Sequence, residues 1–362
     1  KRAVLDDINK FPFPANTIVP HSEIVHDRVS VEIARGCTEG CRFCQAGIIY
    51  RPVRERTPES IIDSALSGLE STGYDEISVT SLSPADYSCF PTLVEKIMDR
   101  VADSRVGVSV SSLRPYGLTE HLAEQIGRVR KTGFTIAPEA GSQRMRDVLN
   151  KGITEENILM AARNASRQGW DLIKLYMMIG VVGETDDDLQ AMVDLAHRIY
   201  AIQRDELKKA GGRTQPRVNM SASSHIPKPF APFQWMAMEA VSTLYAKQQF
   251  IAERIRRKGI KFKRHHVEVS QLEGVISRGD RRVADVIERA YRKGCRFDGW
   301  TELFRYDLWL DSFREAGVDI EPYLADLPVE SRLPWDHIDC LVEKAFLLRE
   351  YLRAKKTLLS PA

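Results

Sequence analysis

The stretch ARGCTEGCRFCQAG (residues 34–47) places three of the six cysteines of this chain within eight positions, at Cys37, Cys41 and Cys44. It directly follows an apolar, β-branched run at 29–34 that predicts a strand. In parallel α/β folds, the loops at the carboxyl ends of the strands carry the functional site. Four thiolates would complete a structural zinc site or an electron-transfer cluster, whereas three leave one corner free for an outside ligand. The stretch therefore predicts a metal site that is open to chemistry.

The overall composition is typical of a soluble globular protein. The 362 residues are 43% hydrophobic and 28% charged, which is sufficient for a large core. No apolar run approaches the ~20 residues of a membrane span, and the N-terminus lacks the layout of a signal peptide. We therefore expect a cytoplasmic protein without a membrane partner, in which clustered cysteines bind metal rather than form disulfides.

Between residues 30 and 224, short apolar runs alternate with longer amphipathic segments. The predicted strands are 29–34, 76–82, 106–112, 133–137, 172–179 and 217–223. The predicted helices include 58–71, 90–102, 118–131, 155–168 and 185–203, and 207–215 is predicted to be an exposed polar insertion. Six alternating strands and helices indicate a parallel sheet, which periodicity alone allows to be either a barrel or an open doubly wound sheet.

Different patterns appear at the two ends of the chain. The chain opens on KRAVLDD without an initiator methionine, so we expect residues 1–29 to be a lead-in segment of a longer protein. After residue 235 the pattern changes to long helices with one strand-like run at 261–269, which predicts a mainly helical extension at 236–362. Within it, residues 254–296 contain 14 Lys or Arg against 5 Asp or Glu, a net charge of +9 in a chain whose total is +2. Solvated helix faces would explain this charge, and so would a docking face for RNA or another phosphate-rich substrate.

The motif CTEGCRFC fits CxxxCxxC, with the aromatic Phe43 before the last cysteine, and resembles the signature of radical S-adenosylmethionine (SAM) enzymes. In that family, Cys37, Cys41 and Cys44 would hold a [4Fe–4S] cluster whose fourth iron is chelated by SAM. Reductive cleavage of SAM then gives a 5′-deoxyadenosyl radical that takes a hydrogen atom from the substrate. The resemblance covers about residues 30–235 and implies a partial (β/α)6 TIM barrel, sensitivity to oxygen, and a reductant such as flavodoxin or ferredoxin.

Further motifs resemble the SAM-binding segments of the family. SLSPADYS stands where many members have a GGE loop, APEAGSQRMRDVLNKG resembles the ribose-binding segment, MIGVVGETDDD is similar to the GxxGET turn, and HIPKPFAPFQW resembles the run that closes the core. The resemblance implies cofactor-binding roles for nine residues: Phe43, Ser81, Ser83, Glu139, Ser142, Lys151, Lys174, Gly183 and Ser223.

Lys174 is a charged residue in a predicted apolar strand. It lies within the apolar fifth strand at even spacing with Tyr176 and Met178, so an inward-facing ammonium group there needs a charged partner. Glu139 and the carboxylate of SAM both satisfy this requirement, and the sequence does not choose between them.

Three functions remain open from the sequence. The first is RNA modification, with residues 254–296 as the docking face. The second is methylation of a small molecule with cobalamin, which would require a cobalamin domain outside this chain; residues 1–29 resemble the linker that follows such a domain in related proteins. The third is a non-catalytic metal-binding protein, for example with a structural zinc completed by a distant ligand.

Overall fold

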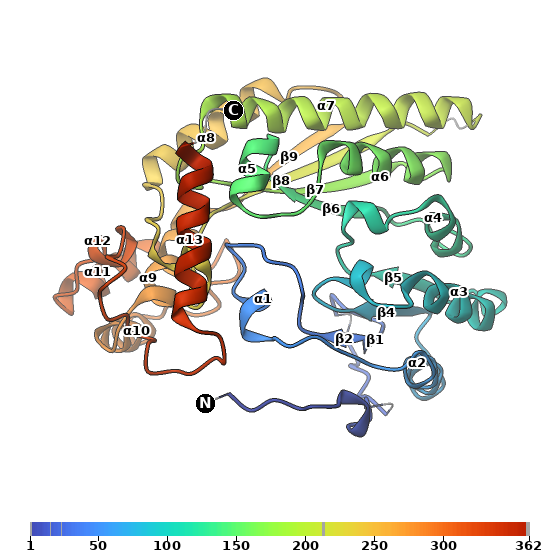
Figure 1. Cartoon of the computed structure of the whole chain (residues 1–362), viewed down its shortest axis with the longest axis horizontal. Helices are drawn as coiled ribbons and strands as arrows, with labels where there is room; N and C mark the ends of the chain where they lie inside the picture. Colours follow the sequence, from blue (N-terminus) through green and yellow to red (C-terminus); the bar gives the residue numbers. More distant parts are fainter. Residues whose placement is uncertain (1, 15, 23, 212–213, 360–362) are drawn as a thin grey trace.

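The computed structural model describes residues 2–14, 16–22, 24–211 and 214–359. Its main strands form two parallel sheets (Figure 1). The first has the order β1 (Val29–Glu32), β4 (Glu76–Thr80), β5 (Gly107–Val110). The second has the order β6 (Phe134–Glu139), β7 (Leu172–Ile179), β8 (Arg217–Ser224), β9 (Ile260–Arg264). The predicted partial TIM barrel is confirmed, and β9 adds a further parallel strand beside β8.

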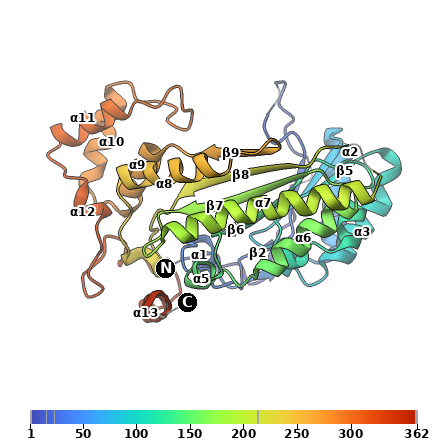
Figure 2. The same ribbon diagram turned by 90° about the horizontal axis from the view of Figure 1, so that it is seen from above.

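Helices cover the outer faces of both sheets (Figure 2). In the first sheet, α2 (Pro58–Thr72) packs on β1 and α3 (Phe90–Val101) on β5; in the second, α6 (Glu155–Arg167) and α7 (Asp186–Lys209) pack on β6 to β8. The remaining elements are β2 (Ala34–Arg35), β3 (Arg54–Glu55), α1 (Ala46–Ile49), α4 (Glu120–Ile126), α5 (Gln143–Val148), α8 (Val241–Arg254), α9 (Val267–Arg278), α10 (Arg282–Arg292), α11 (Tyr306–Glu315), α12 (Glu321–Leu324) and α13 (Lys344–Leu359).

Several predicted boundaries need correction. The helix predicted to end at residue 203 continues to Lys209, because Leu207 remains buried and prolongs the apolar stripe of α7. The helix predicted at 118–131 is shorter, because the Thr119 hydroxyl caps its start and Gly127 follows its last residue. The strand-like run at 261–269 divides into β9 and the first turn of α9. β9 therefore belongs to the same sheet as the core strands, although it lies within the predicted extension.

The two faces of the second sheet differ in chemistry. Along β7, Ile173 and Leu175 are fully buried beneath the helices, whereas the alternating Lys174 is half-buried and Tyr176 is 47% exposed. Because side chains alternate between the faces of a strand, Lys174 and Tyr176 point into the barrel. The interior of this barrel is thus partly polar and accessible to water.

The C-terminal helix α13 closes the carboxyl end of the second sheet. It packs on α5 and on the short helix η5 (Pro232–Trp235), with Trp235 and Tyr351 in ring contact at 5.5 Å between centroids. A second hydrophobic core forms there, to which α1, just after the cysteine loop, contributes Ile48. The cysteine loop and the end of the described chain consequently share one packed unit.

Candidate active site

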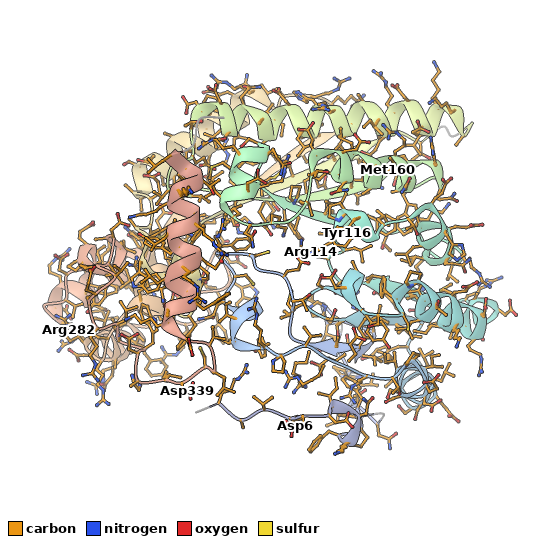
Figure 3. The ribbon with its side chains drawn as sticks, viewed as in Figure 1. Asp6, Arg114, Tyr116, Met160, Arg282 and Asp339 are labelled. Atoms are coloured by element: carbon orange, nitrogen blue, oxygen red, sulfur yellow. The ribbon has the colours of Figure 1, made fainter. Side chains whose placement is uncertain are left out.

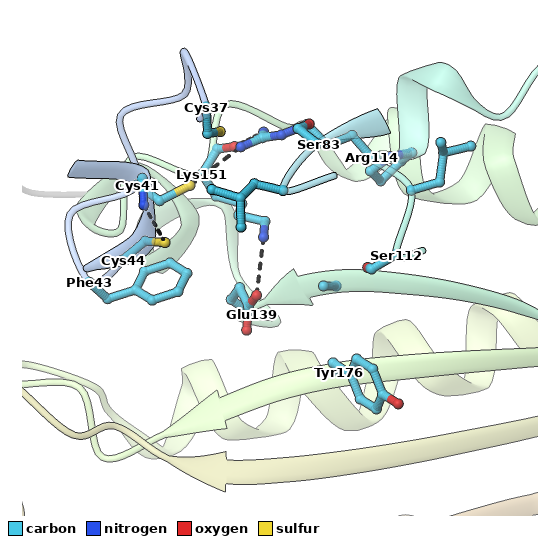
Figure 4. Close-up of a pocket in the computed structure, with 15 residues that line it drawn as sticks. Cys37, Cys41, Phe43, Cys44, Ser83, Ser112, Arg114, Glu139, Lys151 and Tyr176 are labelled. Atoms are coloured by element: carbon cyan, nitrogen blue, oxygen red, sulfur yellow. Dashed lines mark hydrogen bonds and ion pairs between the residues drawn. The ribbon is translucent and has the colours of Figure 1, made fainter. Parts of the chain in front are cut away.

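The three cysteines and the carboxyl ends of β5 and β6 surround one cavity of about 310 Å³. Figure 4 shows Cys37, Cys41 and Cys44 on one side and, across from them, Glu139 from β6 and Tyr176 from β7. The lining residues are Cys37, Cys41, Phe43, Cys44, Gly47, Leu82, Ser83, Ser112, Leu113, Arg114, Pro115, Ala137, Glu139, Lys151 and Tyr176. The cavity lies where parallel folds carry their sites.

The thiols are partly buried and have cationic neighbours. Arg114 Nη2 donates a hydrogen bond to Cys41 Sγ at 3.3 Å, and the backbone N–H of Gly47 donates to Cys44 Sγ at 3.3 Å. Burial raises the pKa of the Cys37 and Cys41 thiols, while Lys151 and Arg114 act on Cys41 in the opposite direction. The cations and donors therefore offset part of the effect of burial, because they stabilise the negative charge of the thiolate, which is the form that binds metal.

A second group of charges lies opposite the thiols. Lys151 Nζ pairs with Glu139 Oε1 at 3.1 Å and lies 5.8 Å from the centroid of the Phe43 ring. Glu139 has a φ of 66°, an unfavourable backbone conformation for a residue with a Cβ. Arg114 also pairs with Glu39 at 3.0 Å. A ligand bound between the thiols and these groups would meet both a carboxylate and an ammonium group.

The structure brings four of the nine predicted cofactor-binding residues to the cavity: Phe43, Ser83, Glu139 and Lys151. The Ser83 hydroxyl is buried and has no hydrogen-bond partner among the described residues. Ser81 instead borders a neighbouring cavity beside Ala34 and Tyr50. Ser83 is accordingly the better placed of the two serines to meet a ligand.

Two further predicted residues serve the packing around the site. The Ser142 hydroxyl donates to Asp188 Oδ1 at 2.6 Å and accepts from the backbone N–H of Met145 at 3.1 Å. Gly183 has a φ of +83°, and a Cβ there would lie 2.6 Å from Leu358 of α13. Ser142 thus connects α5 with α7, and Gly183 leaves room for Leu358 of α13. Neither residue lines the cavity.

Lys174 and Ser223 face the barrel interior, outside the cavity lining. Ser223 Oγ donates weakly to the carbonyl of Met177 at 3.4 Å. Glu139, one of the two expected partners of Lys174, is paired with Lys151. Within the described ranges, Lys174 has neither an ion pair nor a hydrogen bond.

The sequence reasoning missed Arg114 and assigned no role to Tyr176. Arg114 follows the third barrel strand by four residues, so a charged residue just past a strand end was the available signal. Glu184, in the segment that resembles the GxxGET turn, is buried away from the cavity, where it accepts from Lys247 Nζ at 2.9 Å and from the backbone N–H of Gly180 at 2.8 Å. Burial raises the pKa of Glu184, although Lys247 opposes this effect.

The Radical SAM superfamily model matches residues 31–196, and this part of the chain is similar to that superfamily. Members of that superfamily are enzymes that use a [4Fe–4S] cluster and SAM. An uncharacterized protein of Methanocaldococcus jannaschii is 27% identical over 288 residues, which are 80% of this chain and 60% of that relative. A tRNA-2-methylthio-N(6)-dimethylallyladenosine synthase of Desulforamulus reducens is 27% identical over 179 residues, 47% of this chain and 39% of the relative. The matched regions thus span 60% and 39% of the length of these two curated relatives.

Two solved structures resemble the chain at low sequence identity. The radical SAM methyltransferase TsrM from Kitasatospora setae has a TM-score of 0.44 at 17% identity, covering 57% of this chain and 38% of that one. The cobalamin-dependent SAM radical enzyme OxsB has a TM-score of 0.44 at 12% identity, covering 92% of this chain and 54% of that one.

None of the helices in the described part of the chain has the length and apolar character needed to cross a membrane.

The residues of the cavity fit the cofactors of the family. Within the described ranges, no three His, Cys, Asp or Glu side chains are close enough together to hold one metal ion. The three thiols nevertheless line the same cavity, and cysteine thiolates are the ligands that hold iron–sulfur clusters. The carboxylate of Glu139 and the ammonium group of Lys151 can meet the amino and carboxylate groups of a bound amino acid.

Proposed function

We propose that this enzyme reductively cleaves SAM at a [4Fe–4S] cluster and removes a hydrogen atom from a substrate held in the barrel. The observation that supports this proposal best is the lining of a single cavity by Cys37, Cys41, Cys44 and the Glu139–Lys151 pair. We assign residues 30–235 to the catalytic core and residues 236–362 to an extension that completes it with β9 and α13.

In this proposal each group has a distinct task. Cys37, Cys41 and Cys44 hold the cluster, and Arg114 donates to the Cys41 sulfur. Glu139 and Lys151 orient SAM, with Phe43 and Ser83 as further contacts. When bound, the cluster and SAM supply a 5′-deoxyadenosyl radical. The remaining task of the chain is to hold the substrate close to the cavity and to limit access of water.

The C-terminal helix contributes by holding the cysteine loop in place. Arg42, between Cys41 and Cys44, pairs with Glu350 of α13 at 3.2 Å and donates to the carbonyl of Val148 at 2.9 Å. The Arg42 carbonyl accepts from the backbone N–H of Phe233 at 3.1 Å. A loop fixed from three sides can hold three thiolates in a constant geometry, as a cluster requires.

RNA is the substrate class that we favour, for two reasons. The tRNA-modifying relative matches nearly half of this chain. Among the described residues, the basic side chains Lys261, Lys263 and Arg264 of the extension have no acidic partner. The alternative, cobalamin-associated methylation of a small molecule, would need a cobalamin domain outside this chain.

Six free cysteines and an oxygen-sensitive cluster suit a reducing compartment. We therefore propose a cytoplasmic location, with a flavodoxin or ferredoxin as the electron donor.

Anaerobic reconstitution tests the proposal. The chain is loaded with iron and sulfide, reduced with dithionite and given SAM, and 5′-deoxyadenosine and methionine are measured. We expect about four irons per chain and cleavage of SAM, with both absent in a variant carrying Cys37→Ala, Cys41→Ala and Cys44→Ala. Uptake of a single zinc ion with SAM left intact would instead support a non-catalytic metal protein.

A further inference from the structure

Three lysines lie on the barrel-facing side of the second sheet. Lys174 of β7 is in register with Asn219 of β8, which is in register with Lys261 of β9. One step nearer the cavity, Tyr176 is in register with Ser221, and Ser221 with Lys263. Residues in register on parallel strands point to the same face, and Tyr176 lines the cavity. We call Lys174, Lys261 and Lys263 the lumenal lysines.

The other residues of β9 confirm this orientation. Ile260 is buried and Phe262 packs on the hydrophobic core beneath the helices, whereas Lys261 and Lys263 are exposed. Figure 2 shows β9 at the outer edge of the second sheet, at the open side of the barrel. The lumenal lysines are therefore accessible from solvent through that side.

No acidic side chain in the described ranges pairs with a lumenal lysine. The carboxylates at the cavity are already engaged, Glu139 by Lys151 at 3.1 Å and Glu39 by Arg114 at 3.0 Å. A half-buried ammonium group on a central strand is unfavourable without a counter-charge. Lysines on an edge strand also deter pairing with other chains, but that role does not account for Lys174 on β7.

Other charges of the predicted basic segment have different surroundings. Arg282 pairs with Asp280, Arg289 with Asp285, and Arg292 with Glu288. Figure 3 shows Arg282 at the left edge of the view, whereas Arg114 lies near the centre. The charge of +9 counted over residues 254–296 is thus not one surface. Its part on β9, Lys261, Lys263 and Arg264, has no acidic partner in the part of the chain that the structure describes.

We propose that the barrel-facing side of β7 to β9 is the site for a phosphate group of the substrate, bound by the lumenal lysines with Asn219 and Ser221 between them. This inference rests on the proposed function and names the chemistry of its substrate. Neighbouring strands are about 4.8 Å apart, so Lys174 and Lys261 lie roughly 10 Å apart, and their flexible side chains can converge on one phosphate. Lys263 lies level with Tyr176, so a phosphate held here leaves the rest of the substrate free to reach the cavity.

A phosphate of this kind is present in an RNA strand and in a small phosphorylated molecule. Binding of a fluorescein-labelled single-stranded RNA decamer is measured by anisotropy on the reconstituted chain, with AMP and inorganic pyrophosphate as competitors. Equal competition by AMP or pyrophosphate identifies a small phosphorylated substrate, whereas displacement only by unlabelled RNA identifies an RNA strand. Either result supports the phosphate site.

Matched variants locate the binding. Lys174→Gln and the pair Lys261→Gln with Lys263→Gln are each expected to weaken probe binding about tenfold per lysine. The slope of log K against log salt should decrease by about 0.7 for each phosphate contact with single-stranded RNA. Arg264→Gln is the control, because Arg264 is exposed on the same strand but in register with the buried Ala222 of the opposite face.

Charge reversal distinguishes phosphate binding by the lysines of β9 from a role in preventing other chains from pairing with the edge of the sheet. The pair Lys261→Glu with Lys263→Glu keeps the edge of the sheet charged, so the chain should remain folded with its oligomeric state unchanged while probe binding is abolished. The inference is overturned if Arg264→Gln weakens binding as much as the lumenal variants, or if neither RNA, AMP nor pyrophosphate binds. Because binding is measured without turnover, an enzyme that cleaves SAM but binds no phosphate refutes this inference alone. Absence of SAM cleavage refutes the proposed function and leaves the binding result intact.

Discussion

The ion pair between Arg42 and Glu350 gives the most direct test of how α13 supports the cysteine loop. Its atoms lie 3.2 Å apart, and the side chains of Arg42 and Glu350 are only 8% and 12% exposed. Glu350→Ala leaves the Arg42 guanidinium without its carboxylate, although Arg42 keeps its bonds to the carbonyls of Asp147 and Val148 at 2.9 Å. Breaking a buried pair on one side costs about 3–5 kcal/mol. Because Arg42 retains two carbonyl acceptors, we expect the free energy of unfolding to fall by about 2–3 kcal/mol.

Urea denaturation of the reconstituted chain measures this loss, and iron content measures the effect on the site. A double-mutant cycle with Arg42→Ala separates the pair from the rest of the interface. Glu288→Ala is the matched control, because it breaks the exposed pair with Arg292 and should cost less than about 1 kcal/mol. If Glu350→Ala costs no more than Glu288→Ala, or if the two changes in the cycle are additive, α13 does not hold the cysteine loop through this pair.

Three further predictions concern single residues. Arg114→Gln should lower the midpoint potential of the cluster in a redox titration followed by EPR, because hydrogen bonds to cluster sulfurs stabilise the reduced state; an unchanged potential at full iron content would contradict this role. Gly183→Ala should destabilise the chain by about 1–3 kcal/mol, because a Cβ at a φ of +83° meets Leu358, and limited proteolysis should then release α13 first. Burial lowers the pKa of His225 from 6.5 to about 4, so the unfolded state takes up the proton first as the pH falls. Stability should therefore decrease by up to about 3 kcal/mol between pH 6.5 and pH 4, and His225→Gln should flatten this part of the profile if the explanation is correct.

The sequence analysis succeeded where the signal is local. The strand before the cysteine loop and the loop itself form one continuous segment, residues 29–47, and the alternation of apolar runs and amphipathic segments is visible within short windows. It was less successful in predicting, from a residue's position in a motif, that the residue contacts a ligand. Ser142, Gly183 and Glu184 match motif positions, but Asp188, Leu358 and Lys247 are their neighbours in the structure.

The sequence by itself therefore indicated the parallel sheet, the cluster of three cysteines and the resemblance to radical SAM enzymes, because each depends on residues close together in the chain. Only the tertiary structure decided that Arg42 pairs with Glu350, 308 residues away, and that Arg114 reaches Cys41 across 73 residues. It also decided which basic residues face the barrel, since the register of β9 against β8 turns Lys261 and Lys263 toward the barrel and Arg264 away from it. Charge counted along a chain cannot reveal this difference, because strand register sets the face on which each side chain lies.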